Sequence, residues 1–249
     1  MNPTIELLLS HRSIRKFRDK SLNREQVQTL VRSAQAASTS SHIQAYSIIG
    51  VTDQLKKDQL AEVAGNQSYV ANNGHFFVFC ADLYRHKQLG EWAEGDVLDS
   101  IESTEKFMVA AIDAALAAQN MAVAAESYGL GVCYIGGIRN DLYRVREILG
   151  IPKFVIPLFG LAVGVPEQNP EIKPRLPWTH IYHENVYQPD TEEMKRELQE
   201  YDEIMRKYYE ERTKGKRKDR WTELMVTMLE KKSRIYMKEF VEEQGLKRR

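Results

Sequence analysis

The densest group of side chains suited to binding lies near the amino terminus, in the run HRSIRKFR at residues 11–18. It carries four cations and the hydroxyl of Ser13 around the apolar Ile14 and Phe17. The planar guanidinium of arginine matches pairs of phosphate oxygens, and a serine hydroxyl adds a further donor. The run therefore predicts an anion site, although the local charge alone fits a solvated basic surface equally well.

Three further segments could line a binding site. Lys173 and Arg175 flank a proline that fixes the backbone, so either cation could reach a phosphate. The run Tyr134–Gly137 ends in paired glycines, which would let backbone N–H groups approach a flat ligand closely. A strand that simply turns into a loop explains the glycines as well. The polar run Thr39–Gln44 could hydrogen-bond a heteroaromatic ring, or could serve only as a turn.

Several familiar catalytic motifs are absent from the sequence. Tyr134 stands where a dinucleotide-binding fingerprint would need a third glycine after Gly129 and Gly131. There is no P-loop and no G-x-S-x-G run. His180 and His183 lack a surrounding set of cysteines or acids at zinc spacing, so we expect no metal site. Any dinucleotide must be held in another way.

Helices and strands alternate along the first two thirds of the chain. Asn23 and Gln26 form a capping pair that opens an amphipathic helix reaching to about Ala37. An alanine-rich run at 108–126 indicates a buried central helix, capped by Gly129, whose polar residues exclude a bilayer span. Apolar runs predict strands at 45–52, 75–82, 132–138 and 155–165, with further helices at 53–64 and 141–149. Together they predict a sheet flanked by helices.

The chain changes character after residue 165. Five of the eight prolines fall between Pro166 and Pro189, which predicts an extended arm. Residues 191–249 carry 17 Lys or Arg and 14 Asp or Glu with spaced apolar residues, which predicts a charged helical tail. We therefore read 1–249 as one domain with a core at 1–165, an arm at 166–190 and this tail. An arm and an amphipathic tail of this length suggest wrapping around a partner subunit.

The composition sets limits on location and partners. The 35 basic and 35 acidic residues balance, so no global charge favours nucleic acid or an acidic membrane. Cys80 and Cys133 are the only cysteines, which excludes a disulfide framework and fits a reducing compartment. The amino terminus does not read as a secretory signal. We expect a soluble, cytoplasmic protein that binds neither nucleic acid nor membrane.

Taken together, the motifs resemble the oxygen-insensitive nitroreductase and NADPH-flavin oxidoreductase family. Their order and spacing match throughout, and the resemblance covers nearly the whole chain. The resemblance implies an α+β fold with a mixed central sheet flanked by helices, and a homodimer that exchanges its extended C-terminal arms. The motifs are HRSIRKF at 11–17, the serine-rich loop at 39–41, GNQSYV at 65–70, YIGGIRN at 134–140, PLFGLAVG at 157–164, NPEIKPRLP at 169–177 and HENVYQP at 183–189.

The resemblance also implies two FMN sites at the dimer interface. By motif match, the ribityl chain and phosphate of FMN meet His11, Arg12, Ser13 and Arg15. Lys173 and Arg175 approach the flavin from the arm. The remaining residues of the site are Thr39, Ser41, Gln67, Tyr134, Ile135, Gly136 and Gly137. The chain departs from the family pattern at Thr39, where serine is expected, and at His42, where a large apolar residue often faces the acceptor.

The implied activity is hydride transfer from NADPH, or possibly NADH, through bound FMN to nitroaromatic, quinone or flavin acceptors by ping-pong turnover. Flavin carries this chemistry, so no catalytic acid or base is required of the chain. The basic run 212–220 could recognise the 2′-phosphate of NADPH, because Arg212 and Arg217 align with the cations that hold it in the family. The alternative is that the basic tail marks a nucleic-acid or membrane-surface binding module on a non-catalytic scaffold. The acceptor cannot be read from the sequence.

Overall fold

The computed structural model describes residues 2–247. They divide into two compact units, the first made of the chain up to Pro170 together with the part from Arg234 onward, and the second of Glu171–Ser233. The boundary at Pro170 falls inside the run for which the sequence predicts an extended arm. The last described residues pack in the first unit, whereas the sequence groups them with the charged tail.

The first unit is built on a sheet whose described strands run in the order β1-β2-β4-β3. Every neighbouring pair is antiparallel, and β2 is buried along its whole length. The α+β class is confirmed, but the parallel part of the expected mixed sheet is limited to one bridge between Ser13 and Val132. The strands are β1 (Tyr46–Val51), β2 (His75–Asp82), β3 (Gly131–Ile135) and β4 (Val155–Gly164).

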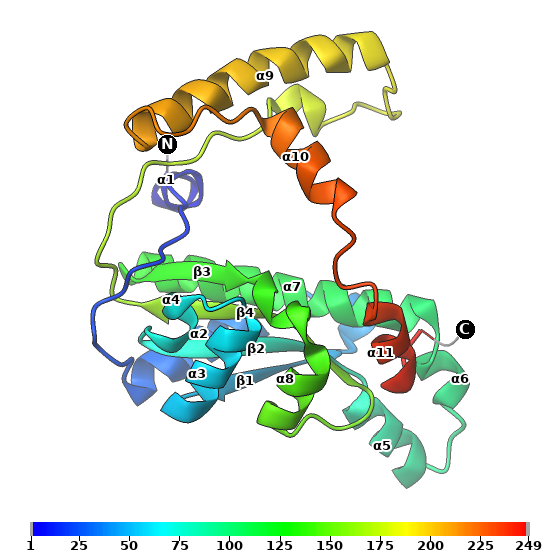
Figure 1. Cartoon of the computed structure of the whole chain (residues 1–249). Coiled ribbons are helices and arrows are strands. Elements are labelled where there is room, and N and C mark those ends of the chain that lie inside the picture. Colours follow the sequence, from blue (N-terminus) through cyan, green and yellow to red (C-terminus); the bar gives the residue numbers. More distant parts are fainter. Residues whose placement is uncertain (1, 248–249) are drawn as a thin grey trace. The chain divides into compact units, whose positions relative to one another are not determined.

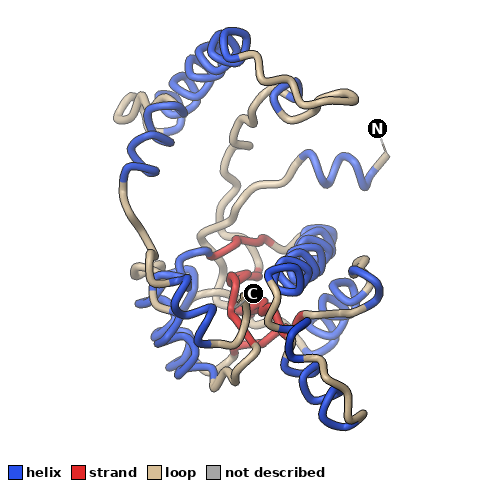
Figure 2. The backbone as a smooth tube through the Cα atoms, turned by 90° about the vertical axis from the view of Figure 1, so that its right-hand side faces the viewer, coloured by secondary structure: helices blue, strands red, loops and turns tan. Residues whose placement is uncertain are grey.

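Helices cover both faces of this sheet, as Figures 1 and 2 show. Side chains alternate between the faces of a strand, so the phenylalanines of β2 divide between two cores. Phe77 and Phe79 pack with α2 (Arg24–Gln35) and α7 (Thr104–Ser127) on one face. The opposite face buries Phe76 and Val78 against α3 (Gln54–Val63), with α8 (Leu142–Leu149) and α4 (Ser68–Ala71) in the same layer.

Local capping signals fix several helix ends where the sequence predicts them. Asn23 and Gln26 form both bonds of the capping box that opens α2. Asp53 and Asp141 accept bonds from the first turns of α3 and α8. Gly129 follows α7 at φ 71°, the left-handed conformation that glycine adopts without strain. The other elements of the first unit are α1 (Pro3–Leu9), η1 (Ser40–His42), α5 (Tyr84–Trp92), α6 (Leu98–Ile101), η2 (Gly136–Asn140) and α11 (Met237–Glu243).

Helix α7 is long and apolar enough to cross a membrane by length and composition alone. Nine of its 24 residues are nevertheless buried inside the first unit, including Asp113. This burial confirms the expected central helix. Three apolar side chains one helical turn apart, Met108, Ile112 and Leu116, are 53%, 53% and 44% exposed and form a stripe along α7.

The second unit has a small core of its own. It is built from α9 (Thr191–Arg212), α10 (Trp221–Glu230) and the short η3 (Trp178–His180). Tyr201, Met205, Tyr208 and Tyr209 form its buried centre. The hydroxyl of Tyr201 donates to the Pro174 carbonyl oxygen at 3.0 Å and so ties the proline-rich segment to α9.

The C-terminal helix α11 belongs to the first unit for a simple reason. Phe240, Val241 and Leu246 are buried in the same apolar cluster as Leu142 and Ile156. The pKa of the nearby Tyr143 hydroxyl is raised, chiefly by desolvation and then by Glu243. These apolar residues are few among many charges, so the composition of 191–249 hides the one segment that returns to the core.

Candidate functional site

The basic segment 11–18 runs beside the edge strand β3. The backbone N–H of Ile14 donates to the Val132 carbonyl oxygen at 2.9 Å, and the Ile14 side chain is buried. Any side chain at Gly131 would meet Ile14 at 2.6 to 2.9 Å, so glycine there permits the close approach. The bridge between Phe17 and Pro166 fixes the other end of the segment. The two apolar residues of the motif therefore anchor a chain that carries its cations between them.

The cations of this segment lack acidic partners within residues 2–247. Arg12 donates to the Pro170 carbonyl oxygen at 3.4 Å. Burial raises the pKa of the Tyr69 hydroxyl, while a hydrogen bond and the charge of Arg15 act in the opposite direction. In the described structure, no carboxylate lies within ion-pair distance of the four cations, which are Arg12, Arg15, Lys16 and Arg18. A cluster of uncompensated guanidinium groups beside a hydroxyl fits a phosphate monoester.

His11, at the start of the segment, is held differently. Its Nδ1 lies 2.7 Å from the Oε1 of Glu126 on α7. Glu126 also raises the pKa of Tyr134, although desolvation is the larger cause. The Tyr134 hydroxyl donates to Gln119 Oε1 at 3.3 Å, and its ring lies edge-on to Phe159. One face of α7 therefore supports both the basic segment and the end of β3.

The YIGG run and Gln67 meet at the end of α3. The strand expected to reach residue 138 stops at Ile135, because Gly136 and Gly137 enter the tight turn η2. A side chain at Gly137 would lie 2.7 Å from the Ala64 carbonyl oxygen, so only glycine allows this contact. The backbone N–H of Gln67 donates to the Ala61 carbonyl oxygen at 3.2 Å. Paired glycines thus bring β3 against the turn that carries Gln67.

The loop that carries Thr39 and Ser41 is strained and is held by one buried carboxylate. Ser41, His42 and Gln44 have φ values of 48°, 58° and 52°, which are unusual outside glycine. Asp113 accepts from the backbone N–H of Ser40 at 3.0 Å and from that of Ala45 at 3.1 Å. The sequence analysis used Asp113 only to exclude a bilayer span. A carboxylate inside an alanine-rich helix was the available signal for this role.

Thr39 also lines a groove with the exposed stripe of α7. The groove has a volume of about 440 Å³ and includes Met108, Ile112 and Leu116. Asp113, which holds this loop, and Glu126, which holds His11, are 13 residues apart on α7, or about 20 Å along the helix axis. The first unit therefore brings together 11–15, Gln67 and the YIGG run, but leaves Thr39 and Ser41 at a separate place along the same helix.

The remaining predicted residues belong to the second unit and converge on two tyrosines. Lys173 Nζ lies 5.4 Å from the centre of the Tyr209 ring, and Arg217 Cζ lies 4.6 Å from the same centre. Arg212 donates to the Tyr208 hydroxyl at 3.0 Å. The sequence gave no reason to select these tyrosines. Lys173 and Arg175 line a cavity of about 330 Å³ with Leu176, Ile181, Tyr201 and Trp221.

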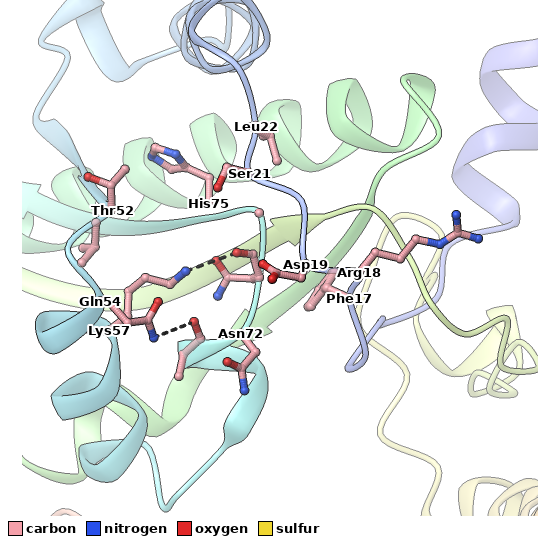
Figure 3. A pocket seen from close by; sticks show the side chains of 14 residues that line it. Phe17, Arg18, Asp19, Ser21, Leu22, Thr52, Gln54, Lys57, Asn72 and His75 are labelled. Atoms are coloured by element: carbon pink, nitrogen blue, oxygen red, sulfur yellow. Dashed lines mark hydrogen bonds between the residues drawn. The ribbon is translucent and has the colours of Figure 1, made fainter.

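A separate polar cavity of about 500 Å³ lies at the end of the sheet, outside the predicted set (Figure 3). Lys57 reaches from α3 to the Asn73 carbonyl oxygen at 3.2 Å, and burial lowers the pKa of its ammonium group. His75, at the start of β2, has a pKa lowered to about 4, first by burial and then by the charge of Lys57. Its buried Nε2 has no hydrogen-bond partner and faces Gly50. In the described chain, no group of three or more His, Cys, Asp or Glu could hold a metal.

A small antiparallel sheet between two helical layers, with unpaired arginines along its edge strand, defines an α+β protein equipped to bind an anionic ligand. The chain belongs to the nitroreductase family. The Nitroreductase family model matches residues 8–165, and the model for the Nitroreductase family, C-terminal domain, matches residues 173–249. The resemblance inferred from the sequence motifs is thereby confirmed.

Individual relatives extend over the whole chain. A Bacillus subtilis (strain 168) protein named FMN reductase (NADPH) is 56% identical over 98% of both chains. The solved structure of B. megaterium NfrA1 is 59% identical, with a TM-score of 0.98 over 99% of this chain and 100% of that one. The NADPH:FMN oxidoreductase from Vibrio harveyi, solved in complex with NAD+, is 41% identical, with a TM-score of 0.90 over the full length of both.

Proposed function

We propose that the chain is an FMN-dependent oxidoreductase that takes a hydride from NADPH and delivers it to a nitroaromatic, quinone or flavin acceptor. The observation that carries this proposal is the cluster of acid-free cations around Ser13 beside β3. The names of the relatives, FMN reductase (NADPH) and NADPH:FMN oxidoreductase, support the same cofactor and reductant. Bound FMN supplies the hydride chemistry, and the protein supplies binding, orientation and electrostatics.

Each part of the candidate site has a role in this proposal. Arg12, Ser13 and Arg15 hold the phosphate, with His11 oriented by Glu126 next to the ribityl chain. Gln67 and the backbone of the YIGG run lie along the flavin. Lys173 and Arg175 provide positive charge that stabilises an anionic reduced flavin and so favours hydride acceptance. Thr39 and Ser41 complete the site from their strained loop.

We propose that the functional form is a homodimer with exchanged arms. The exposed apolar stripe of α7 and its groove are suited to burial against a second copy. Thr39 and Ser41 lie about 20 Å along α7 from the His11 contact, a spacing that a second copy could bridge by lending its own loop. Two free, buried cysteines fit a cytoplasmic location.

The reductant assignment rests on Arg212 and Arg217. A 2′-phosphate distinguishes NADPH from NADH, and arginine is suited to it. Changing Arg217 to Ala should raise the KM for NADPH several-fold more than the KM for NADH. Steady-state kinetics with both reductants measure this, and an equal loss with the two would remove the loop from 2′-phosphate recognition.

One spectrum tests the central proposal against the binding-module alternative. The purified protein should be yellow, with a band near ~450 nm that bleaches on anaerobic addition of NADPH and returns with a quinone. A nucleic-acid module would be colourless and would bind with strong salt dependence. Lys218, Arg220 and Arg217 are each paired with a carboxylate, which lowers the positive potential that such a module would need.

A further inference from the structure

The cations of the 212–220 loop are largely engaged with acids of the second unit. Lys218 lies 3.0 Å from Glu210, and Arg220 lies 3.0 Å from Glu203 and 3.6 Å from Glu223. These pairs tie the loop to α9 and to the start of α10. The same carboxylates reduce the attraction that the loop exerts on a phosphate.

Arg217 is held most tightly of these cations. Its Nε and one terminal nitrogen both lie 2.5 Å from the Asp219 Oδ2, so the carboxylate occupies one edge of the guanidinium fork. Its backbone N–H donates to Thr213 Oγ1 at 2.8 Å, and its guanidinium lies over the Tyr209 ring. The donors that would grip a phosphate in pairs are therefore already used by a carboxylate two residues away.

We infer that Asp219 is a specificity-determining residue that competes with the 2′-phosphate of NADPH for Arg217. This inference rests on the proposed function. A phosphate monoester and the Asp219 carboxylate are both anionic, so the phosphate must displace the carboxylate or bind beside it against repulsion. Because Asp219 is in the same loop, it stays near Arg217 after displacement. The competition weakens binding of nucleotides that carry a 2′-phosphate and leaves those without one largely unaffected.

The test compares two nucleotides on the FMN-loaded dimer by titration calorimetry. The probes are 2′,5′-ADP, which carries the 2′-phosphate, and 5′-AMP, which lacks it. Asp219→Asn keeps the shape of the side chain and removes its charge, so the affinity ratio of 2′,5′-ADP to 5′-AMP should rise roughly two- to fivefold, the range of an exposed ion pair. Glu223→Gln is the matched control, because it removes the same charge beside Arg220 instead.

Arg217→Ala and the double variant with Asp219→Asn complete the cycle. Asp219→Asn should have no effect once Arg217 is absent. The inference is overturned if Asp219→Asn matches the wild type or Glu223→Gln, lowers the ratio, or acts equally without Arg217. If Arg217→Ala itself leaves 2′,5′-ADP binding unchanged, the failure lies in the 2′-phosphate assignment of the proposed function. A loss in Arg217→Ala alone separates the two cases.

Discussion

His75 makes the stability of the first unit depend on pH in a way that one substitution should remove. The imidazole is 8% exposed, lies 4.3 Å from the Phe77 ring, and has a pKa lowered to about 4 by burial and by Lys57. An unfolded chain binds a proton there near pH 6.5. Between those two pKa values the unfolded state holds a proton that the folded state excludes, so stability falls as the pH is lowered through this window.

The size of the effect follows from the two pKa values. At pH 8 both states are neutral at this residue and His75 imposes no proton-linked penalty. At pH 5 the unfolded histidine is almost fully protonated while the buried one is not, which costs about 2 kcal/mol of unfolding free energy. Below pH 4 the loss levels off, because the folded state also takes up the proton.

Urea unfolding at pH 8 and pH 5, followed by circular dichroism at fixed protein and FMN concentrations, measures this difference. Gln reaches as far as the imidazole Nε2 but does not titrate, so His75→Gln should lose about 2 kcal/mol less than the wild type over this interval. The comparison uses the change with pH, so a lower absolute stability of the variant does not affect it. His42→Gln, on an exposed loop, is the control. Parallel pH profiles for His75→Gln and the wild type would refute the reasoning.

Three other substitutions test the site and the assembly. Arg15→Ala should weaken FMN binding roughly 10- to 150-fold by removing a charge-assisted phosphate contact, measured by fluorescence titration against Lys16→Ala, and unchanged affinity would contradict the assignment. Asp113→Ala should lower the unfolding free energy by about 3 kcal/mol, because two backbone donors lose their acceptor, and a loss below about 1 kcal/mol in denaturant titration would argue against this role. Ile112→Lys should shift the protein to monomers in analytical ultracentrifugation, since it places a charge in the apolar stripe, while Leu55→Lys on α3 should not; an intact Ile112→Lys dimer would exclude the stripe as the interface.

The sequence predicts best the features whose signals are local. The Asn23 and Gln26 pair, Asp53 and Gly129 act within a few residues, and the structure has the corresponding helix ends. The end of the third strand was misjudged by about three residues, because apolar composition continues into η2 while the geometry is set by a distant contact between Gly137 and Ala64. Apolar runs define where a strand can lie but not where its neighbours stop it.

Long-range partners escaped the sequence analysis. Asp113 is bonded to residues 68 and 73 positions away, and nothing in its neighbours indicates this role. Tyr208 and Tyr209 face the predicted cations of the second unit only once α9 is formed. The family resemblance selected candidate residues by position, whereas the packing that orients them depends on residues without a motif.

The return of α11 to the first unit changes how the chain can be divided. The second unit is an insertion, because the first unit supplies the chain on both sides of it. Cutting the chain before Thr191 would therefore remove Phe240 from the core of the first unit as well as the charged helices, and could not report on arm exchange alone. The informative deletion is internal and joins Pro170 to Arg234 through a flexible linker. It also follows that the length of the inserted segment can vary without altering the sheet, so evolution could remodel the nucleotide-binding loop while the flavin-binding unit kept both of its ends.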